Sequence, residues 1–263
     1  MANIVVIGGS GEIGRGIVEV LLRHGHSVVA VGRQPQKLAR LAETLGHPPR
    51  LRTLAGSVGS DAEAEALRAA LVAGHAPVDG VVVSVNAPRS PAPLLSHGSD
   101  TLAAVLGTDM LTHYAAAKAL VPLLAPGGSF IGIGGGSADF VLEGGIALSV
   151  AQAGLRMLYR GLAHEFRTRQ VHVHELIVAS VVDSASTRHF ADPHWVSDID
   201  IGEQIARMFA TPEAYADPIW RIARRPRPDA APEVSAEAPT RVQGFRQALE
   251  ATAPGAPGAS ARA

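Results

Sequence analysis

The chain has 263 residues with a net charge of -1, 47% apolar residues and no cysteine. The near-neutral balance lacks the basic footprint of proteins that bind nucleic acid or anionic membranes, and the apolar content predicts a large folded core. Without cysteine the chain has no disulfides, thiolate nucleophiles or cysteine-ligated metals, which favours a reducing compartment.

Short apolar runs alternate with helix-like stretches along the first 222 residues. The runs predict strands over residues 3–7, 27–31, 51–54, 80–85, 128–133, 171–178 and 219–222. The stretches between them predict helices over residues 11–24, 36–45, 61–73, 102–124, 147–167 and 201–209. Continuous apolar strands that alternate with helices are typical of a parallel sheet covered on both faces. The expected fold class is therefore α/β, with a single Rossmann-like, doubly wound parallel sheet and helices on both faces.

The composition changes near residue 225. Residues 225–263 are rich in alanine, proline and glycine, and they bury too little surface to offset the entropy of ordering. We therefore expect a folded domain over residues 1–224 and a disordered tail over 225–263, in which 240–252 has the spacing of one short helix. The first apolar run is too short for a signal peptide and no run approaches the ~18 residues of a membrane span, so we expect a cytoplasmic protein.

A glycine-rich turn follows the first predicted strand. Gly8, Gly11 and Gly14 are spaced G-x-x-G-x-x-G, and a predicted helix opens inside the motif. A backbone without side chains lets a pyrophosphate approach closely, and the helix N-terminus offers free N–H groups and a partial positive charge. The motif predicts a dinucleotide-binding turn in which Gly8, Ser10, Gly11, Ile13 and Gly14 contact the cofactor; the alternative is a turn that serves packing alone.

The end of the second predicted strand indicates which cofactor binds. Sites for NAD carry an acidic residue there for the ribose 2′-hydroxyl, whereas sites for NADP carry a cation for the 2′-phosphate. This strand ends on Arg33 with no acid, and Arg15 offers a second cation. The guanidinium fork suits a phosphate, so we predict NADP(H) in preference to NAD. The alternative is that Arg33 is a solvated loop charge.

On these motifs the chain resembles the short-chain dehydrogenase/reductase family over about residues 3–222. The family's N-N-A-G motif corresponds to Val85-Asn86-Ala87-Pro88, and its adenine-contacting aspartate falls on Ser57. The resemblance therefore implies further cofactor contacts from Ser57, Asn86 and Ala87, a small-molecule substrate, and assembly as a homodimer or homotetramer. In the main subgroup's glycine pattern, Glu12 replaces the middle glycine.

The catalytic tetrad of the family is replaced. The family uses a tyrosine as proton donor, a lysine four residues later, a serine and an asparagine. The closest alignment puts Leu148 at the tyrosine, Gln152 at the lysine and Asp109 at the asparagine. The serine falls in the glycine run 134–136, with Ser137 two or three positions late. Gln152 keeps the hydrogen-bonding capacity to hold the nicotinamide ribose, but Leu148 cannot exchange a proton.

Other side chains are candidates to replace the missing acid. Asp109 and His113 are spaced i, i+4 on one predicted helix, so they form either an acid/base pair or a surface ion pair. Ser137 follows a strand at the edge of the sheet where ligands bind. A Tyr-x-x-x-Lys pattern at Tyr114 and Lys118 lies on the wrong helix, and we interpret it as solvent-facing.

Two functions are consistent with this pattern. The first is an NADP(H)-binding oxidoreductase with a non-standard active site that reduces a quinone, flavin, enone or carbonyl compound. The alternative is a catalytically inactive protein that acts as a nucleotide sensor or partner-binding module, or a non-redox enzyme on the same fold. His172 and His174 share a strand face without a third ligand, so no metal is expected.

Overall fold

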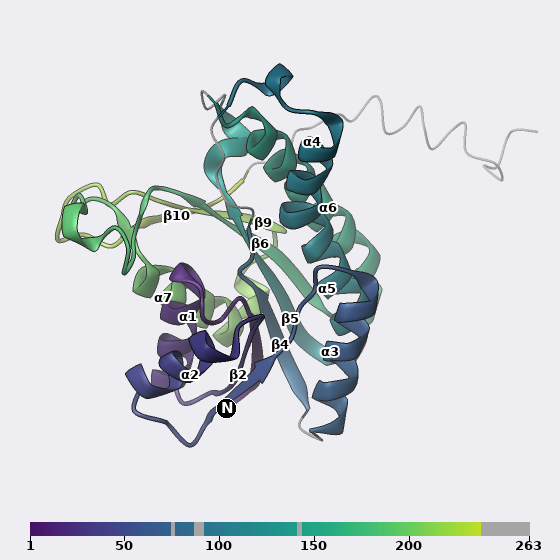
Figure 1. Cartoon of the computed structure of the whole chain (residues 1–263). Coiled ribbons are helices and arrows are strands. Elements are labelled where there is room, and N and C mark those ends of the chain that lie inside the picture. Colours follow the sequence, from purple (N-terminus) through teal and green to yellow (C-terminus); the bar gives the residue numbers. More distant parts are fainter. Residues whose placement is uncertain (75–76, 87–91, 141–143, 238–263) are drawn as a thin grey trace, which may run out of the picture.

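The computed structural model describes residues 1–74, 77–86, 92–140 and 144–237, and these form a three-layer α/β fold (Figure 1). The central sheet has eight strands in the order β10-β9-β6-β5-β4-β1-β2-β3, all parallel to their neighbours except β10. Its strands are β1 (Asn3–Ile7), β2 (Ser27–Gly32), β3 (Leu51–Ala55), β4 (Val78–Val83), β5 (Leu124–Gly135), β6 (His172–Ala179), β9 (Ile219–Ala223) and β10 (Glu233–Ala236); β7 (Val182–Asp183) and β8 (Val196–Ser197) form a separate parallel pair. The predicted fold class is confirmed.

Helices cover both faces of the sheet (Figure 1). One face carries α1 (Glu12–Arg23), α2 (Pro35–Thr44) and α7 (Asp198–Ala210), and the other carries α3 (Asp61–Ala73), α4 (Ser99–Leu106), α5 (Thr112–Leu120) and α6 (Ile146–Phe166). Successive strand residues enter opposite cores, because strand side chains alternate. In β1, Ile4 and Val6 pack toward α1 and α7, whereas Val5 and Ile7 pack toward α5 and α6. Within the described ranges, no helix combines the length and apolar content needed to cross a membrane.

The long helix predicted over residues 102–124 contains an irregular segment. It begins at Ser99 as α4, passes through a π-helical turn (η2, Gly107–Leu111), continues as α5 and ends in a short 3₁₀ turn. Thr112 Oγ1 donates to the Thr108 carbonyl at 2.5 Å across the π turn. Such turns concentrate at functional sites, and this one carries the buried Asp109.

The predicted disorder of the tail was wrong for its first part. Residues 233–236 form β10, which pairs antiparallel with β9 from Glu233 opposite Ala223 to Ala236 opposite Trp220. The strand is short and half-exposed, so it lacks the continuous apolar run that identified the other strands. The strand is stabilised by its hydrogen bonds to β9, and such long-range pairing leaves no pattern in the sequence of the strand itself. The rest of the tail, including the helix predicted over 240–252, lies outside the described residues.

Two glycines of β5 make room for large polar side chains beneath α6. A Cβ on Gly132 would lie 2.0 Å from the Tyr159 hydroxyl, and one on Gly134 would lie 1.9 Å from Glu175 Oε1. Tyr159 and Glu175 are both buried, at 0% and 1% exposure. A side chain at position 134 would displace the buried Glu175 carboxyl, so Gly134 has a packing role of its own.

Candidate functional site

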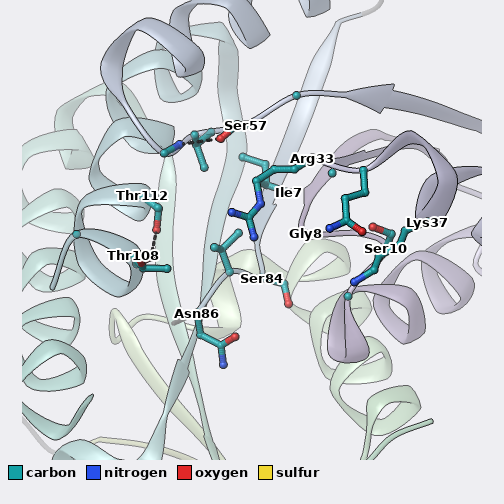
Figure 2. A pocket seen from close by; sticks show the side chains of 18 of the residues that line it. Ile7, Gly8, Ser10, Arg33, Lys37, Ser57, Ser84, Asn86, Thr108 and Thr112 are labelled. Carbon is teal, nitrogen blue, oxygen red and sulfur yellow. Dashed lines mark hydrogen bonds between the residues drawn. The ribbon is translucent and has the colours of Figure 1, made fainter. Parts of the chain in front are cut away.

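A pocket of about 670 Å³ opens at the carboxyl ends of β1, β2 and β4 (Figure 2). This is the edge of a doubly wound sheet at which nucleotides bind. Six of the residues predicted to contact a cofactor line it: Gly8, Ser10, Gly11, Arg33, Ser57 and Asn86. Of the others, Ile13, Gly14 and Gln152 are not among the lining residues, and Ala87 lies outside the described residues.

The turn between β1 and α1 depends on its glycines. Gly8 has a φ of +79°, and a Cβ there would lie 2.1 Å from the Ser84 carbonyl oxygen. A Cβ on Gly14 would lie 2.1 Å from the Gly8 carbonyl oxygen. The role of Gly14 is therefore to let α1 pack close to the turn, and Gly14 itself does not line the pocket. No side chain caps α1 at Gly11. The first-turn N–H groups of α1 are therefore available to an anion.

Two cations stand at the pocket. Arg33 follows β2, and Figure 2 shows its side chain directed into the middle of the pocket, between the turn at Gly8 and the loop that carries Ser57. Lys37 lies one turn further on, in α2, and also lines the pocket. Lys37 was not predicted, although it falls in the first turn of the helix that begins at Pro35, two residues after Arg33. Arg15, the second cation expected there, instead lies 3.8 Å from Asp198.

The loop after β3 and the helical wall complete the pocket. Ser57 Oγ donates to Glu63 Oε2 at 3.0 Å and accepts the Gly59 N–H at 3.1 Å, so the hydroxyl braces this loop. Across the pocket from the glycine-rich turn, Thr108 and Thr112 come from the π turn and the start of α5 (Figure 2). Nothing in the sequence pattern singled out these two threonines.

Three of the predicted catalytic residues meet around Gly135. Gln152 Nε2 donates to Asp109 Oδ2 at 3.2 Å, and Gln152 Oε1 accepts the Gly135 N–H at 2.5 Å. Ser137 Oγ would lie 3.8 Å from a Cβ on Gly135. Asp109 and Gln152 are buried, at 0% and 4% exposure. Asp109 and Gln152 are thus joined at Gly135, two residues before Ser137.

His113 does not lie on a helix surface but is completely buried behind the pocket. Its Nε2 lies 3.0 Å from the Val85 carbonyl, which accepts only, so Nε2 carries a hydrogen. Burial lowers the pKa of His113 to about 4, so the ring is neutral and Nδ1 accepts the Tyr159 hydroxyl at 2.9 Å. Both ring nitrogens are occupied by structural hydrogen bonds. This geometry does not favour the predicted acid/base pair with Asp109.

Replacing Tyr159 by phenylalanine is expected to lower the free energy of unfolding by about 1–3 kcal/mol, because the change leaves a buried histidine nitrogen without its donor. The ring itself, stacked on Phe130, is retained. Chemical denaturation measures the effect. Tyr114→Phe is the matched control, because Tyr114 is 44% exposed on α5. Equal stability of the two variants would contradict the assigned hydrogen bond.

Tyr114 and Lys118 lie on the outer side of α5. Lys118 forms an ion pair with Asp61 of α3, and both side chains are more than half exposed. Lys118 is thus engaged at the surface, in agreement with the solvent-facing interpretation.

Glu12, at the start of α1, accepts the Ser186 N–H at 3.2 Å, and this hydrogen bond joins the segment after β7 to the glycine-rich turn.

The chain is similar in sequence to known oxidoreductases. A family model described as enoyl-(acyl carrier protein) reductase matches residues 9–224. The chain is 28% identical over 200 residues to carbonyl reductase family member 4 of Danio rerio, covering 75% of this chain and 83% of that protein. It is 30% identical over 181 residues to 2,3-dihydroxy-2,3-dihydro-p-cumate dehydrogenase of Pseudomonas putida, covering 67% and 70%.

A solved structure shares the fold. The NADPH-bound short-chain oxidoreductase of Pseudomonas aeruginosa PAO1, which contains an atypical catalytic center, superposes with a TM-score of 0.74 at 21% identity, over 84% of this chain and 94% of that one. The family model, the relatives and the fold agree with the resemblance found in the sequence. The chain belongs to the short-chain dehydrogenase/reductase family of Rossmann-fold oxidoreductases.

Proposed function

We propose that the protein is an NADP(H)-dependent oxidoreductase with a non-standard active site. The observation that carries the proposal is the placement of Arg33 and Lys37 on the pocket of the glycine-rich turn. Two cations beside the position of an adenosine ribose favour a 2′-phosphate over a free hydroxyl. The NADPH bound in the Pseudomonas aeruginosa oxidoreductase supports the same choice.

In this proposal Asp109, Ser137 and Gln152 form the substrate end of the site. Gln152 already accepts from Gly135 and donates to Asp109, so it fixes geometry and has no ionisable proton to give. Ser137 offers a hydroxyl that can orient a substrate oxygen. His113 is held in place as a neutral structural residue. These side chains position a substrate, but Leu148 has no proton to give, so the site lacks the proton donor that the family's tyrosine supplies.

The substrate class follows from this lack. NADPH, when bound, supplies a hydride, and the acceptor must take its proton from water or from a weak donor. Because a tuned general acid contributes about 10²–10⁴-fold, simple ketones are expected to react slowly. Acceptors that stabilise negative charge by themselves, such as quinones, flavins and conjugated enones, are expected to react faster than simple ketones. Activated carbonyl compounds are expected to react at rates between these two groups.

A nucleotide-binding protein without turnover is the second candidate. It is favoured by Leu148, which stands at the tyrosine position on α6, and by Gln152, whose amide already bonds to Gly135 and Asp109. In that case nucleotide occupancy would act on a partner. The atypical catalytic center of the oxidoreductase from Pseudomonas aeruginosa favours the enzyme, since that protein is described as an oxidoreductase.

Oligomerisation and location belong to the same proposal. Leu111, Tyr114, Val150 and Met157 expose between 44% and 63% of their surface along the region of α5 and α6. This exposed apolar surface supports the homodimer or homotetramer expected from the family. We keep the expectation of a cytoplasmic protein that acts on a small molecule.

Oxidation of NADPH, followed at 340 nm against a panel of quinones, flavins, enones and carbonyl compounds, tests the proposal. The enzyme is expected to oxidise NADPH with a quinone or an enone, and Gln152→Ala is expected to lower kcat by about 10- to 100-fold through the loss of positioning. Arg40→Ala, at an exposed position of α2, is the control. Tight NADPH binding with no turnover on any acceptor would contradict the enzyme and leave the nucleotide-binding protein.

A further inference from the structure

The turn over residues 135–139 is held at both ends by one helix. It follows β5 and contains Ser137 within a short 3₁₀ segment, η4 (Gly136–Asp139). At its start the Gly135 N–H donates to Gln152 Oε1 at 2.5 Å. At its end Arg156 Nη1 donates to Asp139 Oδ1 at 2.6 Å. Gln152 and Arg156 are four residues apart in α6, so they lie on one face of the helix, one turn apart.

The second attachment extends to the C-terminal segment. Glu237, the residue after β10, accepts from Arg156 Nη1 at 2.8 Å and from Arg160 Nη2 at 2.9 Å. Arg221 of β9 donates to Asp139 Oδ2 at 2.5 Å and lies 3.9 Å from Glu237. Three arginines and two carboxylates thus join α6, β9, η4 and the end of β10.

The orientation of Arg156 depends on these carboxylates. Its side chain is only 12% exposed, and Nη1 makes both hydrogen bonds. Its Nε and Nη2 are buried without a hydrogen-bond partner among the described residues. Burial would raise the pKa of Asp139, but hydrogen bonds from Arg156 and Arg221 lower it, so Asp139 is a charged partner at neutral pH.

Glu237 balances the charge of this cluster. Without it, three guanidinium groups would share one carboxylate, and their repulsion would act across partly buried side chains that salt screens weakly. Arg156 would then be drawn to Asp139 alone, with no support from the opposite side. The C-terminal segment therefore controls how firmly Arg156 holds the end of the turn.

We infer that Glu237 is a positioning residue for the active site: through Arg156 and Asp139 it fixes the turn that presents Ser137 beside Asp109 and Gln152. The functional meaning of Ser137 rests on the function proposed above. The alternative is that Glu237 only fastens β10 to the sheet. The two differ in which part of the chain loosens when Glu237 loses its charge.

Hydrogen–deuterium exchange of the full chain separates them. Glu237→Gln is expected to speed exchange of peptides covering residues 135–140 by about fivefold, the factor expected when Arg156 loses one of its two carboxylate partners. Glu203→Gln is the matched control, since Glu203 also accepts from two side chains, Arg23 and His24, far along the chain from the turn. Faster exchange in β10 alone, with the turn unchanged, would overturn the inference.

A second variant keeps the test informative if Glu237→Gln unsettles β10. Asp139→Asn breaks the same attachment from the other side, and the double variant is expected to loosen the turn no more than Asp139→Asn does. Additive effects would contradict the inference.

NADPH affinity is expected to stay within about twofold because the cluster does not line the pocket. A wild-type chain that fails to bind NADPH would contradict the proposed function and leave the exchange result standing.

Once an acceptor is found, the two roles also separate kinetically. Glu237→Gln is expected to lower kcat by about 3- to 10-fold at an unchanged KM for NADPH, because a mobile turn no longer holds Ser137 in the position that orients the substrate. Glu203→Gln is expected to leave both constants unchanged. An unchanged kcat in the presence of a loosened turn would contradict the role of the turn in positioning.

Discussion

Exchange of Arg33 for glutamate is expected to weaken NADPH binding by at least about 100-fold, while NADH binding changes by less than about threefold. Arg33 points into the pocket (Figure 2), and a guanidinium binds phosphate through charge-assisted hydrogen bonds. A carboxylate in its place removes these bonds and repels the 2′-phosphate. NADH has no such phosphate, so its affinity depends on the rest of the pocket.

Calorimetric titration of each nucleotide into the wild type and the variant measures the change. Arg40→Glu is the matched control, because Arg40 is also exposed and lies on α2 without lining the pocket. Arg40→Glu changes the charge by the same amount near the site, so it measures the long-range electrostatic effect on nucleotide binding without the loss of a direct phosphate contact. Lys37→Ala is expected to have a smaller effect in the same direction. An NADPH-to-NADH affinity ratio that Arg33→Glu leaves unchanged would reject Arg33 as the 2′-phosphate contact.

Glu175→Gln is expected to gain stability relative to the wild type as pH rises from about 4.5 to 8, because it removes the destabilising contribution of Glu175 over that range. Burial raises the pKa of Glu175 to about 8 against the partial opposition of Arg156, from an ordinary value of 4.5. The native state therefore binds more protons than the unfolded chain across this range. Stability is highest below pH 4.5 as far as this group is concerned, and falls as pH rises toward 8.

The expected size of the effect is large for one side chain. At pH 8.5 the glutamine variant is expected to be more stable than the wild type by about 3 kcal/mol, and near pH 4.5 the two are expected to agree within about 1 kcal/mol. Glutamine keeps the shape that fills the space above Gly134. Denaturant unfolding at several pH values measures the difference. Glu165→Gln, at an exposed position of α6, is the control, and parallel pH profiles for wild type and Glu175→Gln would contradict the assignment.

Much of the fold was predictable because its strands are buried on both faces. The run over residues 4–7 of β1 is apolar at every position, so its length and the glycine that follows it identify the strand. Of the strands that were missed, β7 and β8 span only two residues each, and β10 alternates exposed and half-buried residues over four positions and depends on pairing with β9. The π turn was missed because a helical pattern of apolar residues does not report one extra residue in a turn.

The candidate site was predicted unevenly for a related reason. Gly8, Gly11 and Arg33 follow strands directly, so their place at the pocket follows from local sequence. His113 is different: its i, i+4 spacing from Asp109 is real, but its ring is held in the interior by the Tyr159 hydroxyl and the Val85 carbonyl, two partners far along the chain. Glu237 lies in a segment whose composition predicts disorder, and its position depends on partners far along the chain: the Ile219 carbonyl of β9, which accepts its N–H, and the arginines of α6.

Titration of the wild-type chain with NADPH and with NADH tests the central proposal most directly. The two cations at the pocket predict that NADPH binds at least about tenfold more tightly than NADH, since one charge-assisted phosphate contact is worth about 1.5–3 kcal/mol. Equal affinities, or tighter binding of NADH, would contradict the assignment of Arg33 and Lys37. Binding of neither nucleotide would contradict the proposed function as a whole.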